Sequence, residues 1–384
     1  MGCEKCLPNC CTDGINWKDK NMKNAVMVSQ TEFPKKNIGD YVQAIAARQF
    51  SPDALFVQRE HLKDYDGEPV KMIMNGWFMI HPEQFPPSDK IVPLYISFHM
   101  NPTNAENMLA HGGWEHLKAH EPIGCRDFGT EALLKSKGID AYFSGCLTLT
   151  LGRSYSNNAS REGIYFVDPA FDYRLKGKCY FTKMLNLVRL AVLSLPTLIC
   201  RHRVVVGLWR KLTNISWNEH WERISGVRRL FLALDFYKKY SKIFDDEILR
   251  DAEFIPQHIR QSDFKDEESK FAFADKLLRR YANAELVVTG RIHAALPCTS
   301  IGTPVVFTNL EMQNSGSASS VGRLDGLLQF FNVVDLADGR MMAKFKIDSD
   351  DGKIHKGTSL PRNESWRPYA EAMTARAESF MIGQ

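Results

Sequence analysis

An arginine and a histidine interrupt an otherwise apolar stretch near the end of the chain. Residues 285–289 are typical of a buried strand, and Arg291-Ile292-His293 follows it directly. Open α/β sheets bind their ligands at the carboxyl ends of parallel strands. A guanidinium can grip a carboxylate or phosphate with two hydrogen bonds, and an imidazole can transfer a proton near neutral pH. The segment predicts a site for an anionic substrate, whereas the alternative for His293 is a purely structural hydrogen bond.

A second group of candidates lies near the N-terminus. Asn37, Gly39 and Asp40 connect a strand to a helix, and the free N–H groups of a helix start can hold an anion or a polar ligand. Asp40 is equally suited to cap the helix, and a capping carboxylate beside a cleft can do both. Ser97 and His99 end another strand of this half and are expected to face the same cleft.

Further polar residues follow other strands. Arg126 precedes Asp127, a predicted helix N-cap, and is expected at the sheet edge, although a surface salt bridge of little energetic value is the alternative. Ser144 is a candidate hydroxyl contact for a sugar or a phosphate. His258 closes a strand in the same half as His293 and is expected near it, with an ordinary exposed loop as the equal alternative.

These residues depend on a series of alternating strands and helices. The apolar runs predict strands over 25–29, 54–57, 71–74, 93–98, 122–125, 140–143, 163–167, 252–256, 285–289 and 304–307. The helical spacing of apolar residues predicts helices over 41–49, 103–119, 127–137, 265–281, 292–300, 322–331 and 364–381. Strands that alternate with helices indicate βαβ units and a mainly parallel sheet.

The length of the chain indicates more than one domain. With 384 residues it exceeds what a single hydrophobic core usually serves. A polar stretch at 151–162 without apolar periodicity predicts the linker. The predicted parts are a flexible cysteine-rich tail at 1–22, an N-terminal domain at 23–152, a C-terminal domain at 163–362 with an insertion at 171–250, and a final helix at 363–384.

Composition excludes several classes of protein. A net charge of +4 is too small to suggest a nucleic-acid-binding protein. No window of about 18 apolar residues predicts a membrane span, and the N-terminus lacks the apolar region of a signal peptide. We therefore expect a cytoplasmic protein. Cys3, Cys6, Cys10 and Cys11 crowd the tail, but adjacent cysteines ligate one metal poorly, so we expect free thiols and no metal.

The central basic and apolar segment at 180–210 allows two interpretations. Arg189 and Pro196 interrupt it, which argues against a transmembrane helix. The favoured interpretation is a helical pair that packs on the core of the second domain. The alternative is an amphipathic element that makes peripheral contact with the inner face of the cell membrane, its basic residues facing anionic lipid.

Four motifs together resemble the polysaccharide pyruvyl transferase family. They occupy residues 37–44, 122–127, 140–150 and 287–297, and their order and spacing fit the family over most of the chain. The chain carries no P-loop, G-x-G-x-x-G, nucleophile elbow or H-E-x-x-H motif. Segment 171–250 has no counterpart in the family pattern.

The resemblance implies an α/β fold of two Rossmann-like domains that face each other across a cleft, as in GT-B enzymes, with a helical insertion in the second domain and a final helix that crosses back to the first. It implies transfer of pyruvate from phosphoenolpyruvate, the donor substrate, to two hydroxyls of a sugar in a cell-surface polysaccharide or its lipid-linked precursor. The product is a ketal, and no cofactor is involved. The family's phosphoenolpyruvate-binding segment maps onto Arg291, Ile292 and His293, with Gly290 where many relatives carry serine.

The resemblance also suggests roles for the candidate residues. Arg126 and Arg291 would bind the carboxylate and phosphate of phosphoenolpyruvate. His293 would act as acid or base, and Asp40 would position or deprotonate the sugar. Two alternatives stay open: a GT-B glycosyltransferase that uses a nucleotide-sugar donor, and a sugar-binding protein without catalytic activity.

Overall fold

The structure is a computed structural model of the whole chain. It describes residues 22–29, 35–78, 80–157, 160–171, 180–217, 220–309, 322–337 and 340–382. The four tail cysteines, Cys3, Cys6, Cys10 and Cys11, lie outside the described residues. The α/β class predicted from the sequence is confirmed, with parallel strand pairing in both halves of the chain.

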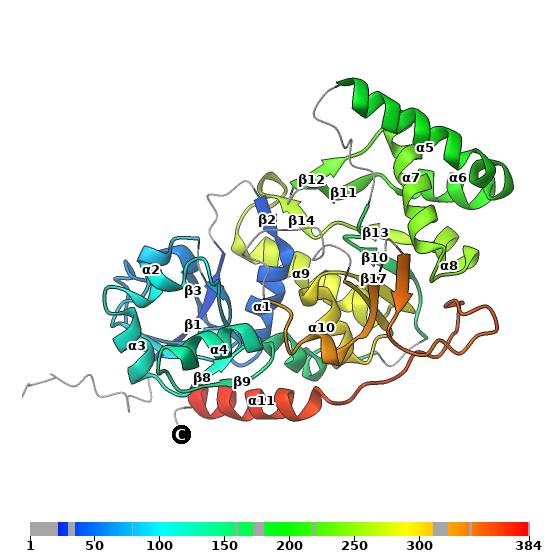
Figure 1. Cartoon of the computed structure of the whole chain (residues 1–384). Helices are drawn as coiled ribbons and strands as arrows, with labels where there is room; N and C mark the ends of the chain where they lie inside the picture. The colour runs from blue at the N-terminus through cyan, green and yellow to red at the C-terminus, as the bar shows by residue number, and fades with distance from the viewer. Residues whose placement is uncertain are drawn as a thin grey trace, which may run out of the picture.

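The N-terminal half contains two four-stranded sheets in which every pairing is parallel (Figure 1). The first has the strand order β3-β1-β4-β6 and comprises Leu55–Gln58, Lys23–Val28, Val70–Ile73 and Ile91–Leu94. The second has the order β5-β7-β8-β9 and comprises Gly76–Phe78, Phe98–Met100, Ile123–Cys125 and Ala141–Phe143. The helices of this half are α1 (Ile38–Arg48), α2 (Ala105–Leu109), α3 (Gly113–Ala119) and α4 (Phe128–Ser136).

Two elements predicted as continuous are broken. The strand expected over 93–98 is wrong as a single unit, because Ser97 adopts a φ of 61° and separates β6 from β7. The helix expected over 103–119 is likewise wrong, since His111 and Gly112 have φ values of 50° and 92° and separate α2 from α3. Left-handed backbone cannot continue a strand or a right-handed helix.

The C-terminal half is built on a six-stranded sheet with the order β13-β10-β15-β16-β17-β18. Only its last pairing is antiparallel. The strands are Glu253–Ile255, Ile164–Val167, Leu286–Thr289, Val305–Asn309, Asn332–Ala337 and Arg340–Ala343, and the helices beside them include α9 (Glu267–Ala282) and α10 (Ile292–Ile301). The helix predicted over 322–331 is wrong: turns and a short 3-10 helix, Leu328–Phe330, lead into two strands that were not predicted.

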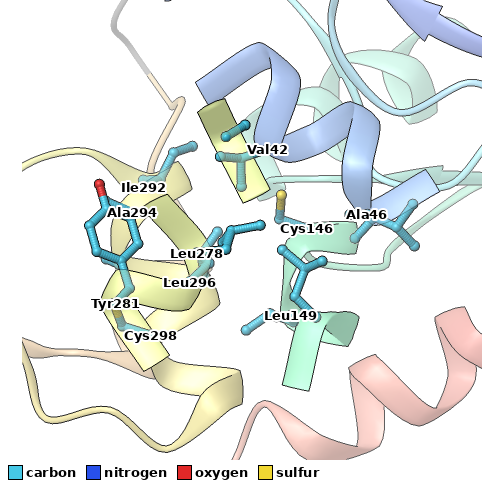
Figure 2. Close-up of a cluster of buried hydrophobic side chains, with 14 of the residues drawn as sticks. Val42, Ala46, Cys146, Leu149, Leu278, Tyr281, Ile292, Ala294, Leu296 and Cys298 are labelled. Carbon is cyan, nitrogen blue, oxygen red and sulfur yellow. The ribbon is translucent and has the colours of Figure 1, made fainter. Parts of the chain in front are cut away.

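Helix α1 joins the two halves. It lies against α9 and α10 and against the 3-10 helix η3 (Leu147–Arg153), and Figure 2 shows Val42 and Ala46 of α1 facing buried side chains of those elements. The Tyr41 ring meets the Phe271 ring edge-on at 5.6 Å between centroids. Close by, the antiparallel strands β2 (Lys35–Asn37) and β14 (His258–Arg260) pair across the same junction. The start of α1 is therefore fixed against the C-terminal half.

The last helix, α11 (Arg367–Ile382), lies along the N-terminal half (Figure 1). The Ser97 hydroxyl contacts the Met373 sulfur at 3.3 Å, and the Lys71 ammonium donates to the Phe380 carbonyl at 3.3 Å. Met373 is buried in the core that also contains α1, α9 and α10. The last described helix, α11, thus lies on the half that contains the first described strand, β1.

Segment 180–250 forms an outer layer on the C-terminal half. It comprises α5 (Tyr180–Cys200), α6 (His202–Lys211), the hairpin β11–β12 (Asn214–Trp217 and His220–Arg223), α7 (Gly226–Tyr240) and α8 (Asp246–Asp251). Helix α6 buries Val205 and Leu208 completely, as the packed interpretation predicts. Helix α5 projects from the body and leaves most of its described side chains exposed, so that interpretation is wrong for α5 (Figure 1).

Candidate active site

Two motifs far apart in the sequence meet at the junction of the halves. A Cβ atom placed on Gly39 would lie only 2.9 Å from Nδ1 of His293 and 3.1 Å from Nε2 of Gln257. The first distance is essentially never seen for a real Cβ, and the second is tighter than nine in ten real Cβ contacts. Glycine is therefore required at position 39, because only its missing side chain lets the start of α1 approach the imidazole. The predicted N-terminal and C-terminal candidates form one site.

Asn37 begins α1. Its side-chain oxygen accepts from the Gly39 N–H at 2.9 Å, and the Ile38 N–H donates to the Gln257 carbonyl at 3.0 Å. The alternative in which Asp40 caps the helix is wrong, because Asn37 is the N-cap residue and Asp40 is the third residue of α1. Its carboxylate is consequently not used for capping and is available to the site.

Asp40 lines a pocket on the N-terminal side of the junction. The pocket encloses about 250 Å³ of empty space, part of it open to solvent, and its polar lining comprises Ser29, Asp40, Gln43, Arg59 and Asn75. The Arg59 guanidinium lies 3.9 Å from the Asp40 carboxylate. Hydroxyl-bearing ligands suit a lining that offers donors and acceptors of this kind.

A carboxylate that was not predicted from the sequence, Asp168, connects candidate residues on the C-terminal side of the junction. Asp168 accepts from Nε of Arg291 at 2.9 Å and from the Gln257 N–H at 2.8 Å, and it lies 3.8 Å from Nδ1 of His258. It is buried and adopts a φ of 49° directly after β10. The rule that identified Arg291, a polar residue at a strand end, could also have found Asp168.

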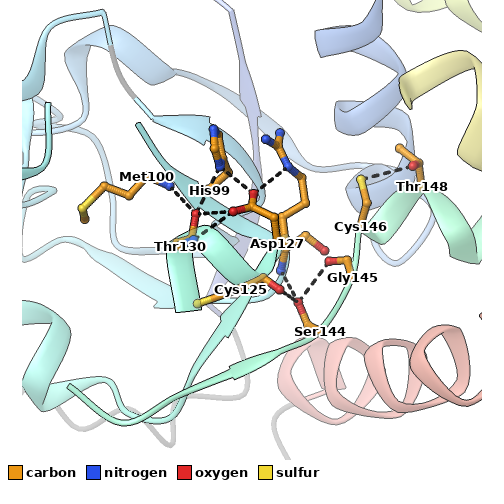
Figure 3. Close-up of polar contacts among 11 residues, drawn as sticks. His99, Met100, Cys125, Asp127, Thr130, Ser144, Gly145, Cys146 and Thr148 are labelled. Carbon is orange, nitrogen blue, oxygen red and sulfur yellow. Dashed lines mark hydrogen bonds and ion pairs between the residues drawn. The ribbon is translucent and has the colours of Figure 1, made fainter. Parts of the chain in front are cut away.

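Arg126 enters the site from the end of β8. It is only 1% exposed, so the alternative of a surface salt bridge is wrong. Asp127 caps α4 by accepting from the Thr130 N–H at 2.9 Å, which confirms its predicted role. The same carboxylate lies 2.6 Å from Nδ1 of His99 and 3.5 Å from Nε of Arg126 (Figure 3). Asp127 thus fixes the orientation of both the His99 imidazole and the Arg126 guanidinium.

Two predicted substrate contacts, Ser144 and Ile292, make their described contacts with other parts of the protein. The Ser144 hydroxyl accepts from the Ser97 N–H at 3.0 Å and donates to the Cys125 carbonyl at 3.0 Å, so it ties strand ends together (Figure 3). Ile292 is 3% exposed and belongs to the core. Both positions shape the site from behind, and a direct ligand contact by either stays a prediction.

A third arginine completes the site and was not predicted. Burial, followed by the charges of Arg126 and Arg291, lowers the pKa of Arg323 to about 10. Arg323 must therefore lie close enough to both guanidinium groups for them to repel it. It stands in a turn rather than at a strand end, and for this reason the strand-end rule could not find it.

The two histidines are neutral in the free protein. Burial, followed by the charges of Arg126 and Arg323, holds the pKa of His293 well below its usual value of 6.5. Burial and Arg126 lower the pKa of His99 to about 4, against the opposing contact with Asp127. Such an excess of positive charge beside neutral imidazoles is suited to binding an anion.

Several buried polar atoms point to a ligand. Within the described part of the chain, Nε2 of His99, Nε2 of His293 and Nη2 of Arg126 have no hydrogen-bond partner. Buried groups without partners are rare in native proteins, and a ligand or an ordered water can supply the missing bonds. Among the described residues, no group of three or more His, Cys, Asp or Glu side chains could hold a metal ion.

Anion binding is predicted to take up protons. A dianion offsets the repulsion from the arginines, so it raises the pKa of His99 from about 4, and that of His293, toward 6.5. Binding of the anion is then accompanied by proton uptake, and the affinity for the anion rises as the pH falls toward the raised pKa values of the two histidines. Calorimetric titration with sulfate at about pH 5.5, in two buffers of different ionisation enthalpy, measures the uptake. His99→Gln and His293→Gln should each reduce it, whereas proton release by the wild type would contradict the charge arrangement.

Gly39→Ala is predicted to disrupt the site. The added methyl group would displace His293 or Gln257, costing about 1–3 kcal/mol of stability and weakening sulfate binding at least tenfold. Gly207→Ala is the matched control. Gly207 lies inside α6, and its Cβ would make only an ordinary contact with Arg250 at 3.7 Å. This substitution should raise the stability by about 0.5–1 kcal/mol. Urea unfolding and calorimetry give both quantities. Unchanged sulfate binding by Gly39→Ala would show that the two motifs do not share one site.

Comparison with known proteins identifies the family. A family model described as polysaccharide pyruvyl transferase matches residues 37–310. Searches of curated proteins and of solved structures returned no match. The matched region begins at Asn37 and contains Arg126, Asp168, Arg291 and His293. The chain therefore belongs to the polysaccharide pyruvyl transferase family and is an enzyme, a transferase of polysaccharide biosynthesis.

Proposed function

We propose that the chain transfers pyruvate from phosphoenolpyruvate to two hydroxyls of one sugar in a polysaccharide or its lipid-linked precursor. The observation that carries this proposal is the convergence of Arg126, Arg291 and Arg323 on the buried imidazole of His293. The polysaccharide acceptor follows from the family. The donor and the ketal product are our inference from the charge and chemistry of the site.

The charges of the site suit phosphoenolpyruvate. The donor carries a carboxylate and a phosphate next to each other, and guanidinium groups bind both of these in pairs of hydrogen bonds. Asp168 accepts from Nε of Arg291 and so fixes the orientation of that guanidinium. Nη2 of Arg126 has no hydrogen-bond partner among the described residues.

His293 is proposed to protonate the donor. Bound phosphoenolpyruvate brings negative charge beside the imidazole and so raises its pKa, which lets His293 hold a proton only when substrate is present. Transfer of that proton to the methylene carbon leaves an oxocarbenium-like centre at the neighbouring carbon. The arginines remain beside the phosphate and stabilise it as it leaves.

Asp40 is proposed to activate the acceptor. One sugar hydroxyl attacks the oxocarbenium carbon, and its proton goes to Asp40. The carbon–oxygen bond to phosphate then breaks, and the second hydroxyl closes the ketal. Of the two protons lost by the sugar, one replaces that given by His293 and the other leaves on inorganic phosphate. The pocket with Gln43, Arg59 and Asn75 is the proposed place of the sugar ring.

The arrangement of strands in the two halves supports the proposal of a GT-B-like fold. Each half carries parallel strands, and the candidate residues come from strand ends and helix starts of both. Asn37, Asp40 and Arg126 belong to the N-terminal half, while Asp168, Arg291 and His293 belong to the C-terminal half. We propose that the N-terminal half binds the acceptor and the C-terminal half binds the donor, with Arg126 reaching the donor from the N-terminal half.

The assay incubates the full chain with phosphoenolpyruvate and a panel of hexosides, and it measures inorganic phosphate release together with an acid-labile product. The wild type is expected to release phosphate only when an acceptor is present. Arg291→Met and His293→Gln should lower kcat/KM at least about 100-fold, since each removes charge or proton transfer in the transition state. Asp40→Asn should lower kcat while leaving KM for phosphoenolpyruvate nearly unchanged.

Arg260→Met is the matched control. Arg260 is an exposed arginine on β14, the strand that also bears His258, and it forms an ion pair with Asp263. It should keep wild-type activity. A nucleotide-sugar donor in place of phosphoenolpyruvate tests the glycosyltransferase alternative. Nucleotide release from such a donor, with no turnover of phosphoenolpyruvate, would overturn the proposal.

A further inference from the structure

Helix α5 carries an apolar stripe that no described part of the protein covers. Its exposed large side chains are 51–72% accessible, namely Leu185, Val188, Val192, Leu193, Leu195 and Ile199. Five of them follow spacings of three and four residues, which places them on one face of the helix. The opposite face, with the buried Ser194, turns toward α6 and α7. A continuous exposed patch of this kind marks an interaction surface.

The charge around the stripe identifies the kind of partner. Residues 173–218 contain nine Lys and Arg residues and no Asp or Glu. Arg189, on α5 itself, and Arg203 and Arg210, on α6, are exposed. One basic residue, Arg201, is neutralised by Asp246 at 2.8 Å. The surface that meets the stripe must therefore be anionic.

An aromatic side chain lies at the edge of the basic region. Trp209 of α6 is 37% exposed, and the Arg229 guanidinium stands 4.8 Å from its ring centroid. Tryptophan beside arginine and lysine is characteristic of segments at the boundary between lipid headgroups and acyl chains. A second copy of the chain fits less well, because two such basic segments would repel each other.

The helices are suited to lying on a bilayer rather than crossing it. Among the described residues no single helix passes as a membrane span by length and hydropathy; Ala191–Cys200 and His202–Lys211 pass only as a pair, and the chain bends by 109° between them. The exposed face of α5 is apolar along 185–199, while its other face packs on the protein. An amphipathic helix of this form binds in the plane of the interface.

We propose that α5 and α6 dock the protein on an anionic lipid surface, with the apolar stripe in the acyl-chain boundary and Arg189, Arg203 and Arg210 among the headgroups. This inference goes beyond the proposed reaction and does not depend on it, since it concerns a surface outside the candidate active site. It gives a role to α5 and α6, which contribute none of the candidate active-site residues.

The test is flotation of the full chain with vesicles of phosphatidylcholine, alone or with about 30% phosphatidylglycerol, at about 0.1 M and about 1 M salt. The wild type is expected to float with the anionic vesicles at low salt, and much less with neutral vesicles or at high salt. A Val188→Ser, Val192→Ser, Leu195→Ser variant should bind at least about tenfold more weakly. Arg203→Gln with Arg210→Gln should bind about tenfold or more weakly.

The matched control is Met342→Ser with Ile382→Ser, which removes two large apolar side chains, 51% and 67% exposed, from other surfaces. It should float like the wild type. All variants should keep the wild-type melting temperature and sulfate affinity, which excludes misfolding. A wild type that stays with the soluble fraction, or a stripe variant that floats normally, would overturn the proposal. So would a stripe variant that changes only the monomer–dimer equilibrium, because a second copy would then be the partner.

Discussion

The concentration of like charge around one imidazole is the constraint on which the site depends. The charges of Arg126, Arg291 and Arg323 all lower the pKa of His293. Burial and the mutual repulsion of the arginines also disfavour the charged form of Arg323 in the free protein. Two carboxylates, Asp127 and Asp168, offset part of that repulsion. Both contacts are made to the Nε atoms of the arginines, which fixes the orientation of the two guanidinium groups. The free protein thus stores unfavourable electrostatic energy that an anion relieves on binding.

The scaffold serves to bring these charges together from distant parts of the chain. Helix α1 is fixed between α9 and α10, strand β2 pairs with β14, and α11 returns to the N-terminal half. As a result the close approach of Gly39 to His293 is set by a large buried core rather than by a loop. Rigid elements of this kind hold catalytic groups in place without a cost at the moment of reaction.

The sequence was sufficient where a side chain follows a strand. Arg126, Arg291 and His293 were found in this way, because a strand of apolar residues is visible in the sequence and its end marks the ligand-binding edge. Asp168 obeys the same rule and was overlooked. Arg323 could not be found, since its position in a turn has no periodic signal and its role arises only from proximity to the other arginines. The pairing of His99 with Asp127 is likewise a property of the folded chain.

The errors in the fold have a common physical cause. Residues with positive φ break elements that apolar periodicity extends: Ser97 breaks the strand, and His111 with Gly112 breaks the helix. Only the second break has a signal in the sequence, the glycine pair Gly112-Gly113. Helix α5 shows a different limit. Its apolar spacing predicts a buried face, but periodicity cannot tell a protein core from an exposed interaction surface. Only the folded structure shows that Val192 and Ile199 are exposed.

The most direct test of the account is a crystal structure of the full chain with phosphoenolpyruvate bound. The account predicts that the carboxylate and phosphate lie among the guanidinium groups of Arg126, Arg291 and Arg323, with the methylene carbon facing His293. Phosphoenolpyruvate bound elsewhere, or bound without contact to any of these arginines, would contradict it.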